Sequence, residues 1–165
     1  EAQGRPVLCD EDAAFVRRLH LAVQAHPVAP LLLTGGVAEG VCRAEYAGVP
    51  CQVRPDYFHP EHGVVDLKTC DDLTWFEADA RRYGYLHQVA FYRAVLRVAS
   101  GTTWPVHIVA VEKKEPFRAG VWLVAESALD FAEAENQAAI GRLRECHASG
   151  IWETGYEGVR IFDCV

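Results

Sequence analysis

Residues 54–69 read RPDYFHPEHGVVDLKT, and this stretch decides how we expect the rest of the chain to fold. Asp56 closes one apolar segment, and Asp66 and Lys68 stand two residues apart at the end of another. Residues 59–63 include a proline and a glycine, which favour a turn. The two segments are therefore expected to pair as an antiparallel hairpin that brings the carboxylates together. Alternate residues of a strand face the same side, so Asp66 and Lys68 would point into one cleft.

Two carboxylates and a lysine in one cleft suit a hard divalent cation. Mg²⁺ keeps several waters and binds through one or two carboxylates together with a substrate phosphate. If the spacing is taken alone, a surface hairpin with scattered charges is the alternative. The stretch therefore predicts a candidate metal site whose assignment depends on the rest of the chain.

Three motifs follow one another along the chain. They are Arg-Pro-Asp at residues 54–56, Asp-Leu-Lys-Thr at residues 66–69, and Gln88 followed four residues later by Tyr92. In their order and separation they resemble the PD-(D/E)XK nuclease superfamily, and within it the chain is similar to the RecE-like exonucleases of the exonuclease VIII type that phages and prophages carry. The likeness runs from about Val23 to the end of the chain.

The resemblance implies a fold and an activity. The fold would be a restriction-endonuclease-like α/β core, with a central mixed sheet flanked by helices. The activity would be hydrolysis of phosphodiester bonds in duplex DNA from 5′ ends, dependent on Mg²⁺ or Mn²⁺ and acting in phage-type recombination. The expected partners are duplex DNA, further subunits in a ring around that DNA, and a single-strand annealing protein.

The resemblance also assigns metal ligands. Asp56, Asp66 and the backbone carbonyl of Leu67 would hold the cation. Glu39 would add a third carboxylate, because it follows a glycine-containing stretch as the corresponding acid does in the family. Glu45 competes for that role, and either glutamate could instead be an ordinary solvent-facing strand residue.

Other residues would act on the reaction or on DNA. Lys68 would orient the attacking water or stabilise developing negative charge. Gln88 and Tyr92, on one helix face, would line the cleft and position Lys68 or a DNA phosphate; the alternative is a packed tyrosine beside a satisfied amide. Arg81 and Arg82 could contact the DNA backbone, although exposed arginines are usually only solvated.

Two other classes of function stay open. The chain could be a restriction or repair endonuclease of the same superfamily, which shares the metal site without ring assembly. It could also be a catalytically inactive DNA-binding or assembly module of this fold, a role that the presence of all three motifs argues against. An end-dependent digestion assay separates the exonuclease from the endonuclease.

Length and composition predict one domain over residues 1–165. Half of the residues are hydrophobic and 24% are charged, so the chain can bury a core and does not span a membrane. The net charge of −7 argues against broad electrostatic affinity for nucleic acid, but a metal site can still grip phosphate through its cation. Because the chain starts at Glu1 and contains no Met, we expect a fragment that lacks the family's N-terminal helices.

The six cysteines form no C-x-x-C pair, which disfavours a zinc ribbon or an iron–sulfur cluster. We expect buried, reduced thiols in a cytoplasmic protein. The cysteines are Cys9, Cys42, Cys51, Cys70, Cys146 and Cys164.

Hydrophobic spacing predicts the order of elements. A first helix, capped by Asp10 or Asp12, should end before Pro27, with His20 and His26 as surface or partly packed histidines. Strands are expected over residues 37–46 and 49–58, around a turn at Ala47-Gly48, and over residues 106–112 and 119–125. A helical region over residues 75–98 should break at Gly84.

The final helix should start at a Ser127/Asp130 capping pattern and end at Gly150. We expect the tail, residues 151–165, to pack back on the domain through Trp152, Tyr156 and Phe162.

Overall fold

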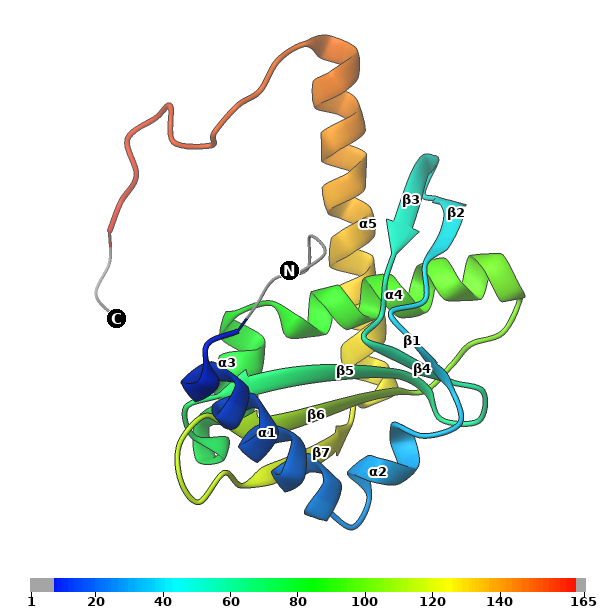
Figure 1. The fold of residues 1–165 in the computed structure, drawn as a ribbon. Helices are drawn as coiled ribbons and strands as arrows, with labels where there is room; N and C mark the ends of the chain where they lie inside the picture. The colour runs from blue at the N-terminus through cyan, green and yellow to red at the C-terminus, as the bar shows by residue number, and fades with distance from the viewer. Residues whose placement is uncertain (1–7, 163–165) are drawn as a thin grey trace.

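A five-stranded mixed sheet lies at the centre of the molecule, which the computed structural model describes over residues 8–162 (Figure 1). In spatial order its strands are β1 (Val37–Ala38), β4 (Tyr57–His59), β5 (Gly63–Cys70), β6 (Val106–Glu112) and β7 (Ala119–Leu123). β5 and β6 run parallel, and the other neighbouring pairs are antiparallel. The predicted mixed α/β fold is confirmed.

Helices cover both faces of this sheet (Figure 1). α1 (Asp10–Ala25) and the short α2 (Ala29–Leu32) pack on one face, and α4 (Tyr85–Ser100) and α5 (Glu126–Ser149) pack on the other. A 3-10 turn (Leu73–Trp75) and α3 (Phe76–Arg82) lead from β5 into α4, which makes the parallel crossover to β6 helical. The predicted break at Gly84 is confirmed, since that residue has a φ of 71° between α3 and α4.

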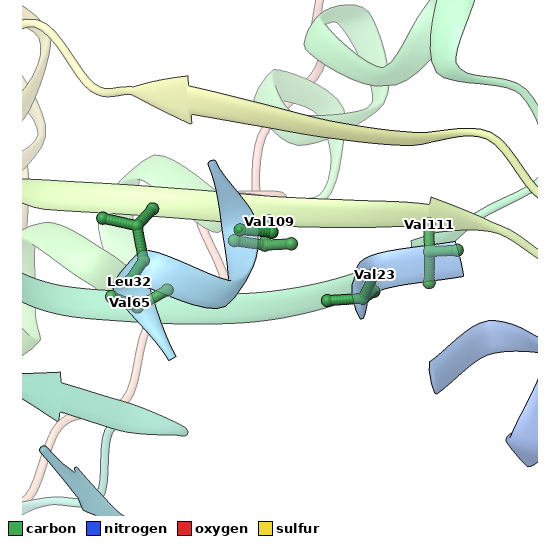
Figure 2. Close-up of a cluster of buried hydrophobic side chains, with 6 residues drawn as sticks. Val23, Leu32, Val65, Val109 and Val111 are labelled. Carbon is green, nitrogen blue, oxygen red and sulfur yellow. The ribbon is translucent and has the colours of Figure 1, made fainter. Parts of the chain in front are cut away.

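Side chains of β5 and β6 alternate between the two helical layers. Val65 and Val109 face α1 and α2, where they pack against Val23 and Leu32 (Figure 2). Val64 faces α4 and α5 instead. Because β6 is covered on both faces, it reads as the nearly continuous apolar run VHIVAVE.

A hairpin stands apart from the main sheet. β2 (Cys42–Tyr46) and β3 (Val49–Val53) pair around Ala47-Gly48 and pack on α4 (Figure 1). The predicted turn is confirmed, and both of its residues have the positive φ of a tight hairpin turn. The two long strands predicted for residues 37–46 and 49–58 were wrong, because Glu39 adopts a left-handed φ of 54° and Pro55 cannot donate to a ladder.

Both predicted helix caps were wrong. The residue that caps α1 is Cys9, whose sulfur accepts from the Asp12 amide at 3.4 Å. α5 begins at Glu126 without a side-chain cap, and Asp130 instead pairs with the Arg93 guanidinium at 2.5 Å. Asp130 thus bonds a cation on α4, and water can solvate the uncapped end of α5. The predicted end at Gly150 is confirmed by its left-handed conformation.

The segment after α5 does not pack back on the domain, so that prediction was wrong. Trp152, Tyr156 and Phe162 are 58%, 74% and 88% exposed, and Figure 1 shows the segment extending away from the sheet. The reason lies in α5, whose buried residues end at Glu133. Gly150 therefore starts the tail from a helix end that already stands in solvent.

Thiols are less buried than the sequence predicts. Cys70 is buried, Cys9 is exposed, and the other three described cysteines are half-buried; Cys164 lies outside the described residues. All five described cysteines are free. Within residues 8–162, every helix is too short or too polar to cross a membrane.

Candidate active site

The candidate site is built on an open stretch of the edge of β5. The ladder between β4 and β5 ends at the Tyr57–Val65 pair, although β5 continues to Cys70. Asp56, immediately before β4, meets this stretch with its side chain: its Oδ2 accepts a hydrogen bond from the Leu67 amide at 2.7 Å. The predicted proximity of Asp56 to the Asp-Leu-Lys motif therefore arises because a carboxylate continues the ladder where β4 stops.

Asp66 and Lys68 project from the same face of β5. The Lys68 ammonium forms an ion pair with Asp66 Oδ2, and it lies 4.9 Å from the centre of the Tyr85 ring at the start of α4. The Asp66 side chain is fully buried, while that of Lys68 is 15% exposed. Alternation along the strand thus directs both groups toward α3 and α4, beside the buried Cys70.

Burial makes the Asp66 carboxylate electrostatically costly. Its pKa is raised above the ordinary value mainly by desolvation; Lys68 opposes the rise and the charge of Asp56 adds to it. Oδ1 of Asp66 is buried with no hydrogen-bond partner among the described residues. A divalent cation would supply that missing partner and relieve the repulsion between the aspartates, so the donor set fits a hard metal ion.

A cavity of about 670 Å³ lies against this edge, on the α1 side of the sheet. Leu67 and Thr69 line it from the strand, and α1 supplies the opposite wall. Asp66 is buried toward the other side of β5 and is not among the lining residues. The polar side chains that line the cavity are His20, Gln24, Glu39, Asp56, Lys68 and Thr69.

The two candidate glutamates lie in different places. Glu39 follows β1, lines the cavity, and pairs with Arg54 at 2.9 Å; its amide donates to the Asp56 carbonyl at 3.0 Å. Glu45 is exposed on β2, on the opposite strand face from Ala44 and Tyr46, which pack toward α4. Across residues 8–162, no three side chains of His, Cys, Asp or Glu converge as a metal-binding group, so Glu39 does not meet the aspartates in this structure.

His20, expected to be a surface or partly packed histidine, is exposed and lies on the cavity wall. The α1 stripe that faces the cavity includes Val16, His20, Val23 and Gln24. The i, i+4 spacing of His20 and Gln24 is the sequence signal for a shared face. His26 has a structural role, because its Nδ1 accepts from the Val28 and Ala29 amides at the start of α2.

The remaining predicted residues lie on α3 and α4, away from the cavity. Gln88 donates to the Tyr92 hydroxyl at 2.8 Å, and Tyr92 packs into the core between α4 and the strands. Arg81 lines a separate hollow of about 270 Å³. Arg82 lies over the Tyr83 ring, 5.6 Å from its centre. The structure therefore groups Asp56, Asp66, Leu67 and Lys68 more closely than it groups the other candidates.

Two comparisons with known proteins found matches. The sequence matches a family described as a PDDEXK-like domain of unknown function (DUF3799) over residues 7–161. The structure is similar to the crystal structure of a protein named "Putative exonuclease" from Eubacterium rectale, with a TM-score of 0.74 and 16% sequence identity. The match covers 94% of this chain and 64% of that one. None of the curated proteins matches.

Proposed function

Because the chain belongs to the family of PDDEXK-like domains of unknown function (DUF3799), we propose that it is a metal-dependent deoxyribonuclease. One observation carries this proposal: Asp56, buried Asp66 and Lys68 meet at an open strand edge, where one carboxylate oxygen has no partner. A purely structural role would leave such an oxygen hydrogen-bonded, since an unsatisfied buried charge is costly.

Asp56 and Asp66 would hold Mg²⁺ or Mn²⁺, together with the backbone carbonyl of Leu67. When bound, such a cation lowers the pKa of a water molecule and stabilises negative charge on the phosphate oxygens. Glu39, on the cavity wall with Arg54 as its partner, is the proposed third carboxylate. Mg²⁺ usually binds through only one or two protein carboxylates, so the two aspartates could hold the cation without Glu39.

Lys68 would supply positive charge to the phosphate undergoing attack. Its ammonium is held by Asp66 on one side and by the Tyr85 ring on the other. A fixed cation needs little reorganisation when charge develops in the transition state, which is the basis of electrostatic catalysis. Gln88 and Tyr92 are proposed to support α4 one and two turns beyond Tyr85, and Arg81 and Arg82 to contact the DNA backbone.

The finer proposal is an exonuclease that degrades duplex DNA from 5′ ends in phage-type recombination. It rests on the sequence motifs and on the likeness of the fold to the Eubacterium rectale protein named as an exonuclease. A ring of subunits and a single-strand annealing partner belong to the same proposal. This chain spans 64% of the length of that neighbour. The assembly of the whole protein is therefore also a proposal.

The test compares linear and circular duplexes of one sequence in Mg²⁺, Mn²⁺ and excess chelator. An exonuclease should degrade the linear form, release a 5′ label before a 3′ label, and leave the covalently closed circle intact. Asp66→Ala, purified identically, controls for contaminating nucleases. Cutting of the circle would instead favour an endonuclease, and full activity in chelator would contradict metal dependence.

A further inference from the structure

A series of aromatic and cationic side chains leads away from Lys68 on the α4 side of β5. The Lys68 ammonium lies 4.9 Å from the Tyr85 ring centre, and the Tyr85 ring lies 6.0 Å from that of Tyr83. The Arg82 guanidinium lies 5.6 Å from the centre of the Tyr83 ring. The candidate catalytic lysine is therefore linked to the protein surface by two neighbouring tyrosines and an arginine.

The break between α3 and α4 places the two tyrosines differently. α3 ends at Arg82, and Gly84 takes the left-handed conformation, with φ of 71°, from which α4 starts. Tyr85 is half-buried and lies 6.3 Å from the Phe76 ring, whereas Tyr83 is 60% exposed. Tyr85 is thus anchored in the fold while the Tyr83 ring remains open to solvent.

An exposed ring with an arginine beside it suits an unpaired nucleobase. Proteins that bind single strands combine cationic groups, which follow the phosphates, with aromatic rings on which bases stack. Every base has a flat π surface, so such stacking tolerates any sequence. Arg82 can contribute both a phosphate contact and a cation–π interaction from the same position.

We propose that Tyr83 and Arg82 form a stacking platform for an unpaired base of the strand whose phosphate lies at Lys68. The platform implies that the strand enters the site as a single-stranded or frayed DNA end, so the end of a linear duplex must open before it is cut. This inference rests on the proposed nuclease function and adds a specificity-determining residue to it. The Tyr85 ring lies 4.9 Å from Lys68 and 6.0 Å from the Tyr83 ring, so the path from Lys68 to Tyr83 spans about three nucleotide steps of about 3.4 Å each.

The experiment measures binding and cleavage separately. Binding of the parent and Tyr83→Ala chains to a fluorescein-labelled single strand of about 12 nucleotides is followed by anisotropy in Ca²⁺, whose loose geometry should support little cleavage. Tyr83→Ala should bind about 5- to 150-fold more weakly, the range that corresponds to losing one base stacked on an aromatic ring. Tyr83→Trp should bind at least as tightly as the parent, because indole also stacks.

A matched control comes from the segment after α5. Tyr156 is 74% exposed and has the Arg160 guanidinium 4.2 Å from its ring centre, so it offers the same pair of groups. The segment that carries it extends away from the sheet (Figure 1). Tyr156→Ala should bind and cleave like the parent. Thermal unfolding of Tyr83→Ala should match that of the parent, since the ring is largely exposed.

Two further readouts identify stacking as the cause. A strand in which abasic sites replace the bases nearest the cut end should bind the parent and Tyr83→Ala equally. In Mg²⁺, the Tyr83→Ala change should reduce the cleavage rate on single strands and frayed duplex ends by a larger factor than the cleavage rate on fully paired ends.

Failure of the platform and failure of the nuclease assignment give different results. If the parent cleaves DNA in Mg²⁺ and Tyr83→Ala binds and cleaves every substrate equally well, the platform is overturned and the nuclease stands. If the parent cleaves no DNA but Tyr83→Ala still loses binding that abasic strands also lose, the platform stands and the nuclease assignment falls.

Discussion

At the scale of single residues, Asp66 shows a conflict between stability and the proposed chemistry. Its pKa is raised by burial, so the folded state favours the neutral carboxyl. When an acid has a higher pKa in the folded state than in the unfolded state, the protein is most stable at a pH below the unfolded pKa. That stability is lost as the pH rises through the unfolded pKa toward the folded pKa. At neutral pH without metal, the Asp66 carboxylate therefore opposes folding.

Asp66→Asn should accordingly be more stable than the parent at pH 7 in chelator and should lose DNA cleavage. The difference in unfolding temperature should shrink at about pH 3, below the ordinary value, where the parent carboxyl is protonated in both states. Calorimetric or fluorescence melting at the two pH values checks this. A less stable Asp66→Asn at pH 7 would contradict the electrostatic interpretation. Addition of Mg²⁺ should stabilise the parent and leave the variant unchanged.

Lys68→Ala separates metal binding from chemistry. Because Asp56 and Asp66 hold the proposed cation, metal binding measured calorimetrically should stay near the parent value. Cleavage should slow by about 100-fold or more, the usual effect of losing one electrostatic stabiliser. Asp66→Ala should lose both properties. Cleavage by Lys68→Ala at the parent rate would make Lys68 a structural lysine.

Sequence spacing predicted the arrangement of the candidate residues on β5 better than it predicted what surrounds them. Asp66 and Lys68 are two apart, and strand geometry alone puts them on one face. The facing wall was not predicted, because helical periodicity in α1 does not say which strand edge the His20 stripe will meet. Nor does the sequence show that Glu39 turns toward Arg54 through a left-handed backbone.

At the scale of elements, a buried arginine connects α4 to α5. Arg93 is 2% exposed and pairs with Asp130 at 2.5 Å and with Glu133 at 3.4 Å. Glu133 is also buried and receives a second bond, from Arg97. The two helices are therefore held by an ion cluster as well as by apolar packing.

Arg93→Ala should lower the free energy of unfolding by about 3–5 kcal/mol, because it leaves Glu133 buried with one cation fewer. Replacing Arg93 and Glu133 together by leucine should recover much of that loss, since apolar pairs often substitute for buried ions. Asp130→Ala, at a side chain 69% exposed, should cost less than about 1 kcal/mol. Urea unfolding of the three variants checks this order, and an equally large loss for Asp130→Ala would refute it.

Glu112, at the end of β6, gives a pH-dependent contact. The Arg118 guanidinium is the main cause that lowers its pKa to about 2, and the Leu73 amide also donates to it, at 3.0 Å. A depressed pKa contributes stability above the ordinary value of 4.5 that is lost as the pH falls toward about 2. Between these pH values the parent should lose stability more steeply than Glu112→Gln. Parallel urea midpoints for the two proteins across this window would contradict the prediction.

The long elements were predicted from the sequence because their signals are long. The helical region broken at Gly84 keeps a helical spacing of apolar residues over many positions, and β6 is a nearly continuous apolar run. The short ones were not predicted, since Glu39 and Pro55 interrupt strand patterns that look continuous. The predicted cap of α5 was wrong because Asp130 pairs with Arg93, which is distant in the sequence and therefore not visible in the local pattern.

At the scale of the whole molecule, the segment after α5 contributes exposed apolar surface. Six large side chains between Ile151 and Phe162 are 58–102% exposed. Apolar stabilisation scales with area removed from water, so these side chains add little to the fold as it stands. A concentration of such residues is also typical of surfaces that associate.

A chain that ends at Gly150 should therefore keep the parent's unfolding free energy to within about 0.5 kcal/mol, the usual range for surface changes away from packed features. Urea unfolding at low protein concentration measures this directly. Light scattering at high concentration should show less self-association for the shortened chain, because its exposed apolar area is smaller. A loss of several kcal/mol at low concentration would show that the segment packs on its own domain in solution. Cleavage of short single strands should be unchanged, since the proposed contacts with DNA lie at Lys68, Arg81, Arg82 and Tyr83, all outside the removed segment.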